Sequence, residues 1–391
     1  MTTVEDRLVH PPGSAVTEGS ALVRAAAAAG HGTRVRELLD DGWAGSARAE
    51  VELMLWAADY GAFQVIHNRL DENTAEPMLR IARGWVAVDP TAELRRRLGD
   101  AHAAAHRQTV PVDDYDHTEC IRVTAADGRW AEVQTAHLAI VTYIEERLGV
   151  GASRDELMAR ALVDRDPDAI NWSQSVFSVK ERPNATATFR WAADVLVAPD
   201  PDARRFAAEV VHSLSFDQAP SRAEALATLR SRLAAEPEAG VLVSLIGAFA
   251  EYHGPGKVPE IVAHAEHPDP SVRRRVAGEL CIALMEPGSV PEGTAALARL
   301  GGDRDGWVRA TALRVLRDHV FDHPVTRDLI AAGRDDPDPR VRAEALAGLA
   351  RSGDTAACAE LRRLGNEAGE GSPLAMMADA AEGWLHRAKA G

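Results

Sequence analysis

The chain has 391 residues, and its 59 acidic against 44 basic side chains give a formal net charge of −15. This balance argues against a protein that binds nucleic acid through a broad basic surface, and against an anionic membrane as the partner. Three cysteines are too few for a disulfide framework or a zinc site, and no uninterrupted run of about 18 apolar residues could cross a membrane. We therefore expect a cytoplasmic protein with no nucleic-acid partner and no membrane partner.

The N-terminal third contains helical patterns after a short tail. Residues 1–19 carry acids and prolines, and we expect them to form a flexible tail. Residues 20–107 contain two imperfect copies of one pattern, in which a helix stops at Gly30 or Gly61 and a short turn leads into a second helix. This region is therefore expected to consist of stacked helix pairs.

The two copies resemble the helix-turn-helix half of ankyrin repeats. No Thr-Pro-Leu-His tetrapeptide precedes either copy, and the hairpins between repeats are short or missing. A third pair of helices is expected at 75–86 and 91–105. The resemblance implies ankyrin-like helical repeats over 20–107.

An acidic linker and a β-hairpin are expected between 108 and 135. Residues 119–124 and 130–135 alternate apolar and polar side chains on the two sides of Asp127-Gly128, a strong hairpin signal. Because an isolated hairpin is marginally stable in water, it must pack against a helical array. A helix over 136–148 would then open the second array.

One short signature occurs seven times in the C-terminal two-thirds of the chain, at spacings of 33 to 36 residues. It consists of an acid or serine, then proline or glycine, any residue, and alanine or valine, which together predict a capped helix start. A shorter amphipathic helix precedes the later copies, so each unit is expected to be a pair of antiparallel helices. The copies begin at Asp166, Asp200, Glu236, Asp269, Asp305, Asp338 and Ser372.

Three of these copies carry a more specific resemblance. Those that begin at Asp269, Asp305 and Asp338 continue into Val-Arg, and they resemble HEAT repeats of the bacterial, phycobilin-lyase-like type. The first and third copies lack this pair and are assigned on spacing and helix start alone. The resemblance implies about seven HEAT-like helix pairs over 136–391, stacked around one core. The fold class expected for the chain is an all-α solenoid, ankyrin-like and then HEAT-like, with one β-hairpin insertion.

The arginines of the signature suggest a structural role. Arg273, Arg309 and Arg342 each follow a predicted capping Asp by four residues, which predicts a ladder of stacked Asp and Arg side chains along the array. The run that begins at Arg273 could instead contact phosphate, as in HEAT-like DNA glycosylases with a basic cleft. The local excess of acids favours the ladder.

Residues able to hold a metal occur in two places. His102 and His106 are four apart on an expected helix, a spacing that can hold a metal ion. A denser candidate cluster consists of Asp318, His319, Asp322 and His323. Because histidine near a helix C-terminus is also favoured by the helix dipole, we expect no metal and no cofactor. No phosphate-binding glycine loop, nucleophile elbow or Cys-x-x-Cys pair occurs, so we assign no catalytic residue.

The first HEAT-like unit has an unusual second helix, rich in Trp, Asn, Gln and Ser. Such residues are common on recognition surfaces, so we predict a partner-binding surface on this helix and on the hairpin turn. Its residues would be Asn171, Trp172, Gln174, Ser175, Asp127 and Arg129. Alternatively, Trp172, Val176 and Phe177 belong to the core.

These features predict a cytosolic, bacterial, repeat-type scaffold or adaptor that binds a protein partner on its concave or junction surface. The acidic charge of the chain favours a partner with a basic patch. The alternative is a HEAT-like enzyme or self-protection protein that binds a small molecule or modified nucleic acid in the groove. A well-formed pocket with convergent polar groups at the junction of the two arrays would favour this alternative.

Overall fold

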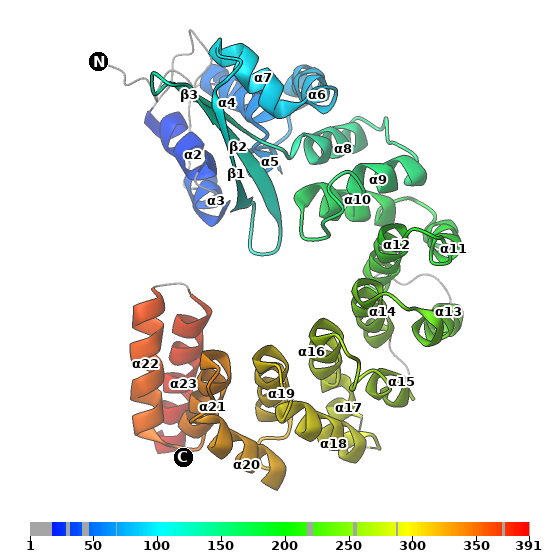
Figure 1. The fold of residues 1–391 in the computed structure, drawn as a ribbon, viewed down its shortest axis with the longest axis vertical. Helices are drawn as coiled ribbons and strands as arrows, with labels where there is room; N and C mark the ends of the chain where they lie inside the picture. The colour runs from blue at the N-terminus through cyan, green and yellow to red at the C-terminus, as the bar shows by residue number, and fades with distance from the viewer. Residues whose placement is uncertain are drawn as a thin grey trace. The chain divides into compact units, whose positions relative to one another are not determined.

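The computed structural model describes residues 18–28, 32–40, 47–67, 69–216, 222–252, 256–286, 288–369 and 372–390. The chain divides into two compact units, residues 1–213 and 214–391, and helices dominate both of them (Figure 1). Residues 1–17 of the expected tail and Gly30 lie outside the described residues.

Among its described residues, the first unit contains six helices before a small sheet and five after it. Before the sheet lie α2 (Glu18–Ala28), α3 (Gly32–Asp40), α4 (Ala47–Tyr60), α5 (Phe63–Ile66), α6 (Glu72–Val86) and α7 (Pro90–Leu98). After it lie α8 (His137–Arg147), α9 (Arg154–Ala161), α10 (Ile170–Lys180), α11 (Ala185–Val195) and α12 (Pro201–Leu214), which ends at the boundary of the unit.

The predicted hairpin is confirmed as part of an antiparallel sheet with the order β1-β2-β3. Its strands are β1 (Ala104–Pro111), β2 (His117–Thr124) and β3 (Trp130–Gln134). Gly128 lies in the β2–β3 turn with a φ of +85°, which glycine adopts without strain. As expected, the sheet packs on helices, chiefly α7 and α4.

The helix expected at 91–105 is wrong in its second half, because α7 ends at Leu98 and residues from 104 onward form β1. Gly99 has a φ of +74° and its N–H is bonded to the carbonyls of Arg95 and Arg96, which ends the helix. Only Val110 of β1 is buried. The strand therefore lacks the apolar alternation by which a strand is recognised in a sequence.

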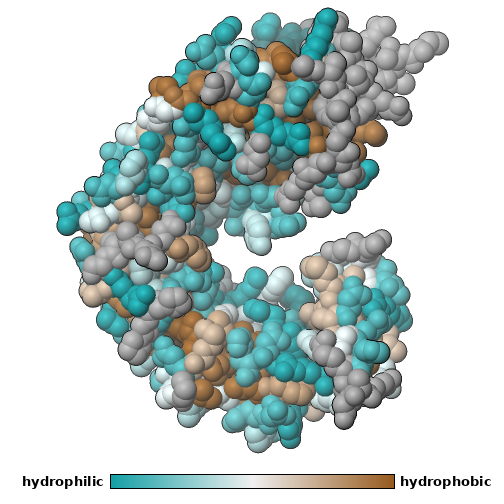
Figure 2. Space-filling view, turned by 180° about the vertical axis from the view of Figure 1, so that it is seen from behind, coloured by the Kyte–Doolittle hydropathy of each residue, from teal (hydrophilic) through white to brown (hydrophobic). Residues whose placement is uncertain are grey.

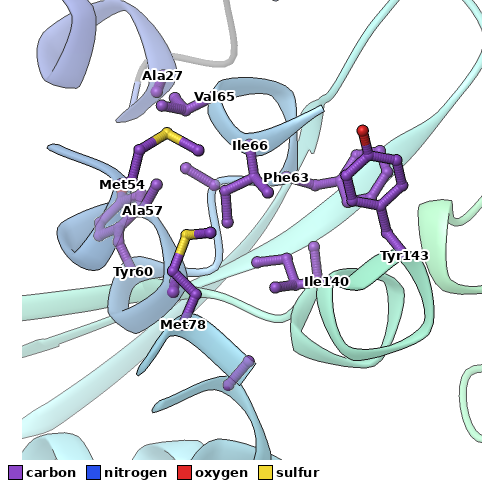
Figure 3. Packing of buried hydrophobic residues seen from close by; sticks show 14 of the residues in the cluster. Ala27, Met54, Ala57, Tyr60, Phe63, Val65, Ile66, Met78, Ile140 and Tyr143 are labelled. Carbon is purple, nitrogen blue, oxygen red and sulfur yellow. The ribbon is translucent and has the colours of Figure 1, made fainter. Parts of the chain in front are cut away.

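The N-terminal helix pairs share one core with α8. Figure 3 shows Met54 and Tyr60 of α4, Phe63 of α5, Met78 of α6 and Ile140 of α8 packed together. All five are nearly or fully inaccessible to solvent. The helix predicted at 136–148 is thus confirmed, and it closes the core that the preceding helices leave open.

Gly61 ends α4, as predicted, and the structure supplies a second reason for glycine there. Its φ is +81°, and a Cβ atom at this position would lie 2.0 Å from the carbonyl oxygen of Gln134 in β3. A side chain would therefore collide with the backbone of the sheet. This close approach links the first helices to the sheet, and Gln134 also donates a hydrogen bond to the carbonyl of Ala27 in α2.

The second unit is a stack of helix pairs in two layers (Figure 1). One layer contains α14 (Ala239–Glu251), α16 (Pro270–Glu279), α19 (Gly306–His319), α21 (Pro339–Arg351) and α23 (Pro373–Ala390). The other contains α13 (Arg222–Ala235), α15 (Val258–Val262), α18 (Val290–Gly301), α20 (Pro324–Gly333) and α22 (Thr355–Ala368), and α17 (Cys281–Met285) precedes α18. The expected class, an all-α solenoid with a β insertion, is confirmed.

Five of the seven predicted helix starts are confirmed, those of α12, α16, α19, α21 and α23. The starts predicted at Asp166 and Glu236 are wrong, because α10 and α14 begin at Ile170 and Ala239. Their N-caps are Ala169 and Glu238, whose side chains make no capping hydrogen bond. The two signature acids instead accept the N–H two residues further on, in the turn before the helix. Both copies lack the Val-Arg pair, although the copies at Asp200 and Ser372 also lack it and do start a helix.

The Asp/Arg ladder exists, but with a different acid. Arg273 pairs with Asp303 through two hydrogen bonds of 2.7 and 2.8 Å, and Arg309 pairs with Asp336 at 2.9 and 2.6 Å. These acids lie two residues before the capping aspartates of the following repeat. Arg342 donates to two backbone carbonyls of its own turn, those of Asp336 and Pro337. Each arginine thus fixes the loop before its helix, and two of them also join neighbouring repeats.

Among the described residues, no helix combines the length and apolar character needed to cross a membrane. Figure 2 shows hydrophilic residues over much of the visible face of each unit, with smaller hydrophobic patches between them.

Candidate functional site: an arginine- and tryptophan-lined cavity

The strongest candidate site is an open cavity of about 770 Å³ in the second unit, within the size range of ligand sites. It lies on the layer formed by α14, α16, α19, α21 and α23. Its charged and aromatic lining consists of Arg274, Arg275, Glu279, Trp307, Arg314, Arg340 and Glu344. Ala310, Ala343, Leu374 and Met377 add an apolar part.

Trp307 is the central side chain of this cavity. It lies in the first turn of α19 and remains 46% exposed, although it is a large aromatic residue. The guanidinium carbon of Arg274 lies 4.0 Å from its ring centroid, and that of Arg340 lies 4.3 Å away. These arginines come from α16 and α21, the helices that pack on α19. The result is a cation–π cluster that joins three successive repeats.

Arg340 is held in place by a neighbouring carboxylate. Its Nε and Nη2 donate to Asp338, the N-cap of α21, at 2.9 and 2.6 Å. The Asp338 carboxylate occupies space beside Gly306, where a Cβ atom would lie 1.8 Å from Oδ2. Glycine at the first position of α19 is therefore needed for the arrangement of Asp338 and Arg340 beside Trp307.

Arg275 is positioned in a similar way. A Cβ atom on Gly247 of α14 would lie 1.6 Å from its Nη2, so this glycine leaves room for the guanidinium group. The Nε atom of Arg275 lies 3.0 Å from Glu279. Burial raises the pKa of Glu279, and the charge of Arg275 opposes that rise. Two glycines of the second unit thus make room for charged groups at the cavity.

Two arginines of the cavity have no acidic partner within the part of the chain that the structure describes. Arg274 makes its cation–π contact and no ion pair, and Arg314 is exposed without one. Partial burial, then repulsion from Arg340 and Arg314, lowers the pKa of Arg274. Because arginine remains protonated at neutral pH, both groups keep their positive charge, and Asp305 attracts Arg274 and Glu344 attracts Arg314 without forming an ion pair.

The acids of the lining do not cancel this charge. Glu344 is buried and forms an ion pair with Arg317, which lies outside the lining. Burial raises the pKa of Glu344, although the charge of Arg317 opposes the rise. The lining therefore contains four arginines and two glutamates, and each glutamate is already paired with an arginine. Arg340 is also paired, with Asp338, so Arg274 and Arg314 are the lining arginines without an ion pair among the described residues.

The four residues of α10 predicted to form a recognition surface are buried instead. Trp172 is completely inaccessible, donates to Glu209 at 2.6 Å and packs edge-on against Phe206. Asn171, Gln174 and Ser175 are between 1% and 6% exposed. The prediction that these four side chains form an exposed surface is wrong. The alternative is correct for Trp172 and Val176, which are buried, and wrong for Phe177, which is 52% exposed.

The polar side chains of α10 have internal partners, which explains their unusual composition. Asn171 accepts from the N–H of Ala139 and donates to Asp164 and to the carbonyl of Thr135. Gln174 donates to Ser178. The bonds of Asn171 to Ala139 and Thr135 connect α10 to the start of α8, whereas the bond of Gln174 lies within α10.

The hairpin residues Asp127 and Arg129 are exposed, as expected. Arg129 donates to the Asp127 carboxylate at 2.7 Å and to the carbonyl of Leu98. The turn lies at one end of β2, whereas Ser173 of α10 contacts Asp116 at the other end. β2 has eight residues with a rise of about 3.3 Å per residue, and its length separates the turn from the contact between Ser173 and Asp116. The structure does not bring the predicted halves of this surface together.

Neither predicted metal candidate forms a cluster. Within the described ranges, no group of three or more His, Cys, Asp or Glu side chains is placed to hold a metal ion. His102 precedes β1 and His106 lies in it, so they do not share a helical face.

The residues of the denser cluster have separate contacts. His323 caps α20 through Nδ1, Asp322 pairs with Arg327, and Asp318 pairs with Arg317. His319 is the last residue of α19. The four side chains are therefore parts of a helix end and a helix start.

The first unit has a second cavity of about 710 Å³, at the junction where α6, α8, α9 and α10 meet. His137 forms part of its wall, stacks on Trp85 and lies 3.2 Å from the carbonyl oxygen of Asp59. Burial lowers the pKa of His137 to about 4, so the ring is neutral at pH 7. Among the described residues that line the cavity there is no serine, cysteine or lysine nucleophile.

The main cavity follows the repeat register, and this signal is present in the sequence. The second residue after each capping residue lines it: Ser271, Trp307, Arg340 and Leu374. So does the fifth: Arg274, Ala310, Ala343 and Met377. The third residue is instead buried at Val272, Val308 and Val341. An alignment of the repeats on their caps would therefore have identified the exposed face and its arginines.

Comparisons with known proteins agree with the repeat architecture. Residues 293–371 match the family of HEAT repeats, and this segment contains Trp307 and Arg340. The match supports HEAT repeats in this part of the second unit. No curated protein gives a significant match.

Two solved structures show a distant similarity. An X-ray structure of the Escherichia coli protein YibA matches 60% of this chain and 93% of its own, at 19% identity and a TM-score of 0.44. A crystal structure of an engineered protein matches 99% of both chains, at 15% identity and a TM-score of 0.40.

Proposed function

We propose that this protein is a repeat-type scaffold or adaptor that binds a protein partner on the face formed by α16, α19 and α21. HEAT repeats generally mediate protein–protein interaction, and stacked helix pairs offer extended binding faces. The observation that carries the proposal is the exposed Trp307 between Arg274 and Arg340. Tryptophan and arginine are the residues most enriched at the energetic centres of interfaces.

Site-specific photo-crosslinking in the native host tests this proposal. A photoreactive amino acid replaces Thr311, which lines the cavity, and in a control it replaces Arg327, an exposed residue of α20 outside the lining. We expect protein adducts from position 311 that are absent or much weaker from position 327. Equal adduct patterns, or no adduct from position 311, would contradict the proposal.

The charge of the partner is a separate question. The net charge of −15 led us to expect a partner with a basic patch, and the acidic remainder of the surface could still attract one. The cavity itself carries the opposite local charge and favours acidic groups. We also propose a cytoplasmic location and no nucleic-acid or membrane partner.

The repeat types of the two arrays remain part of the proposal. Helix pairs α2/α3 and α4/α5 support an ankyrin-like assignment for 20–107, and the Val-Arg starts of α16, α19 and α21 support the phycobilin-lyase-like type for the HEAT array. We place the change between the arrays after residues 108–135, the segment of the acidic linker and the hairpin, and both assignments suggest a bacterial source.

A second candidate function rests on the junction cavity of the first unit. Its volume and its convergent polar groups, which include His137, Asn171 and Asp164, favour a bound small molecule and thus the enzyme or self-protection alternative. Mass spectrometry of small molecules retained by the purified protein tests this. Retention that is lost in an Ala159→Trp variant, which places bulk at an exposed lining position, would favour it.

A further inference from the structure

We infer that the partner presents an extended acidic segment, rich in Asp or Glu, to the cavity around Trp307; this inference rests on the proposed function of the same face. The segment would place carboxylates against Arg274 and Arg314 and smaller apolar side chains against Leu374 and Met377. The residues of α16, α19 and α21 supply the charge, and those of α23 supply the apolar edge.

Charge complementarity is the first argument. The four arginines of the lining exceed its two glutamates, and Arg274 and Arg314 lack an acidic partner among the described residues. Charged hydrogen bonds to carboxylates are the strong interactions available to such groups, because a guanidinium can donate two parallel N–H bonds. An incoming carboxylate would therefore gain bonds without breaking an existing ion pair of either arginine.

The geometry of the ring is the second argument, because it separates a peptide from a nucleic acid. Proteins bind single-stranded nucleic acid by stacking bases on exposed aromatic rings. The ring of Trp307 already has a guanidinium group within 4.3 Å of its centroid from each neighbouring helix. A base would have to displace one of these arginines in order to stack. The contact of Arg274 with the ring uses the face of its guanidinium group, and its N–H groups have no carboxylate partner among the described residues.

The spacing of the arginines is the third argument. Arg274 and Arg340 are stacked on one ring although they come from different repeats. In an extended peptide, alternate side chains lie on the same side at about 7 Å, so one acidic residue could reach Arg274 and the next could approach Nη1 of Arg340, which the pair with Asp338 does not use. Arg314 lies about two helical turns further along α19 than Trp307, where a third acidic residue would reach it.

Fluorescence anisotropy with a labelled peptide in which Glu alternates with Ala tests the inference on the full chain. We expect binding that weakens as the salt concentration rises, because the contacts are between charges. Trp307→Ala should weaken binding about tenfold or more, which corresponds to the loss of an energetic centre. A peptide with Lys in place of Glu, and a single-stranded oligonucleotide, should bind at least about tenfold more weakly.

Charge reversal at two matched positions provides the control. Arg314→Glu and Arg299→Glu change the net charge equally, and both residues are exposed, but Arg299 lies on α18 outside the lining. We expect at least about a tenfold loss for Arg314→Glu and less than about a twofold loss for Arg299→Glu. Equal losses, or tighter binding of the oligonucleotide, would overturn the inference. If adducts form from position 311 but the acidic peptide does not bind, this inference fails while the proposed function stands.

Discussion

Arg309 and Asp336 form a two-point ion pair that joins one HEAT-like repeat to the next, with N–O distances of 2.9 and 2.6 Å. Both side chains are about 15% exposed, so the pair is largely shielded from water. The remaining nitrogen of Arg309 donates to the carbonyls of Asp303 and Arg304, which fixes the loop before α19. Removal of one partner would therefore affect both the interface between repeats and the loop that precedes Trp307.

We predict that Asp336→Ala lowers the free energy of unfolding by about 3 kcal/mol, because it leaves a shielded guanidinium group without its carboxylate. Asp335→Ala is the matched control, since Asp335 is the exposed neighbour in the same loop and should change stability by less than about 0.5 kcal/mol. Urea unfolding followed by circular dichroism measures both. Similar midpoints for the two variants would show that the pair contributes little.

Gly61 and Gly99 offer a comparison between strain alone and strain with collision. Both have positive φ values, but only at Gly61 would a Cβ atom meet another group, the carbonyl of Gln134. Gly99→Ala should cost about 1–2 kcal/mol through backbone strain, and Gly61→Ala about 3 kcal/mol or more because the sheet must also move. Chemical denaturation of the two variants decides this, and equal losses would argue against the close approach.

Trp172 is predicted to act on stability rather than on binding. Trp172→Ala should cost roughly 3–5 kcal/mol, because it removes a fully buried ring packed against Phe206. Trp172→Phe should cost less, since it keeps an aromatic ring and loses mainly the hydrogen bond to Glu209. A thermal melt of Trp172→Ala that superimposes on that of the parent protein would contradict the buried position.

Asp116 predicts a pH dependence of the first unit. Burial raises its pKa to about 6, with repulsion from Asp113 and Asp168, while the Ser173 hydroxyl and His117 oppose the shift. An unfolded aspartate titrates near pH 4, so the folded form binds this proton more tightly, and stability should fall as the pH rises from about 4 to 6.

Asp116→Asn should abolish this fall, because the amide does not ionise, and it should make the protein more stable than the parent above pH 6. Urea unfolding of both proteins across the range from pH 4 to pH 8 measures the effect. Parallel stability curves would show that Asp116 is not responsible.

Local signals account for the parts of the fold that the sequence predicted. The starts of α16, α19 and α21 depend on an Asp N-cap and the residue after it, so a few consecutive residues determine them. β1 could not be predicted, because its residues face solvent and carry no apolar alternation. Gly61 is also required because the carbonyl oxygen of Gln134 lies close to it. This contact could not be predicted, because the sheet begins more than forty positions further along the chain.

The candidate site was accessible to sequence reasoning only in part. The composition of α10 predicted a recognition surface, but its Asn and Gln side chains form hydrogen bonds inside the protein. Composition alone cannot tell a buried polar network from an exposed polar surface. The Arg274–Trp307–Arg340 cluster could be found from the repeat register, but its positive local charge is hidden in the acidic total of the chain. Which arginines lack acidic partners depends on contacts between repeats, which no single repeat contains.

The central claim is that Trp307 belongs to a binding surface and is not merely a structural element between two arginines. The most direct test is photo-crosslinking from position 311 in the parent protein and in the Trp307→Ala variant. Urea unfolding of both proteins accompanies it. Because the ring is 46% exposed, we predict an unfolding midpoint close to that of the parent and a loss of most of the adducts. An unchanged adduct yield would contradict the claim, and so would a loss of adducts that only accompanies a large drop in stability.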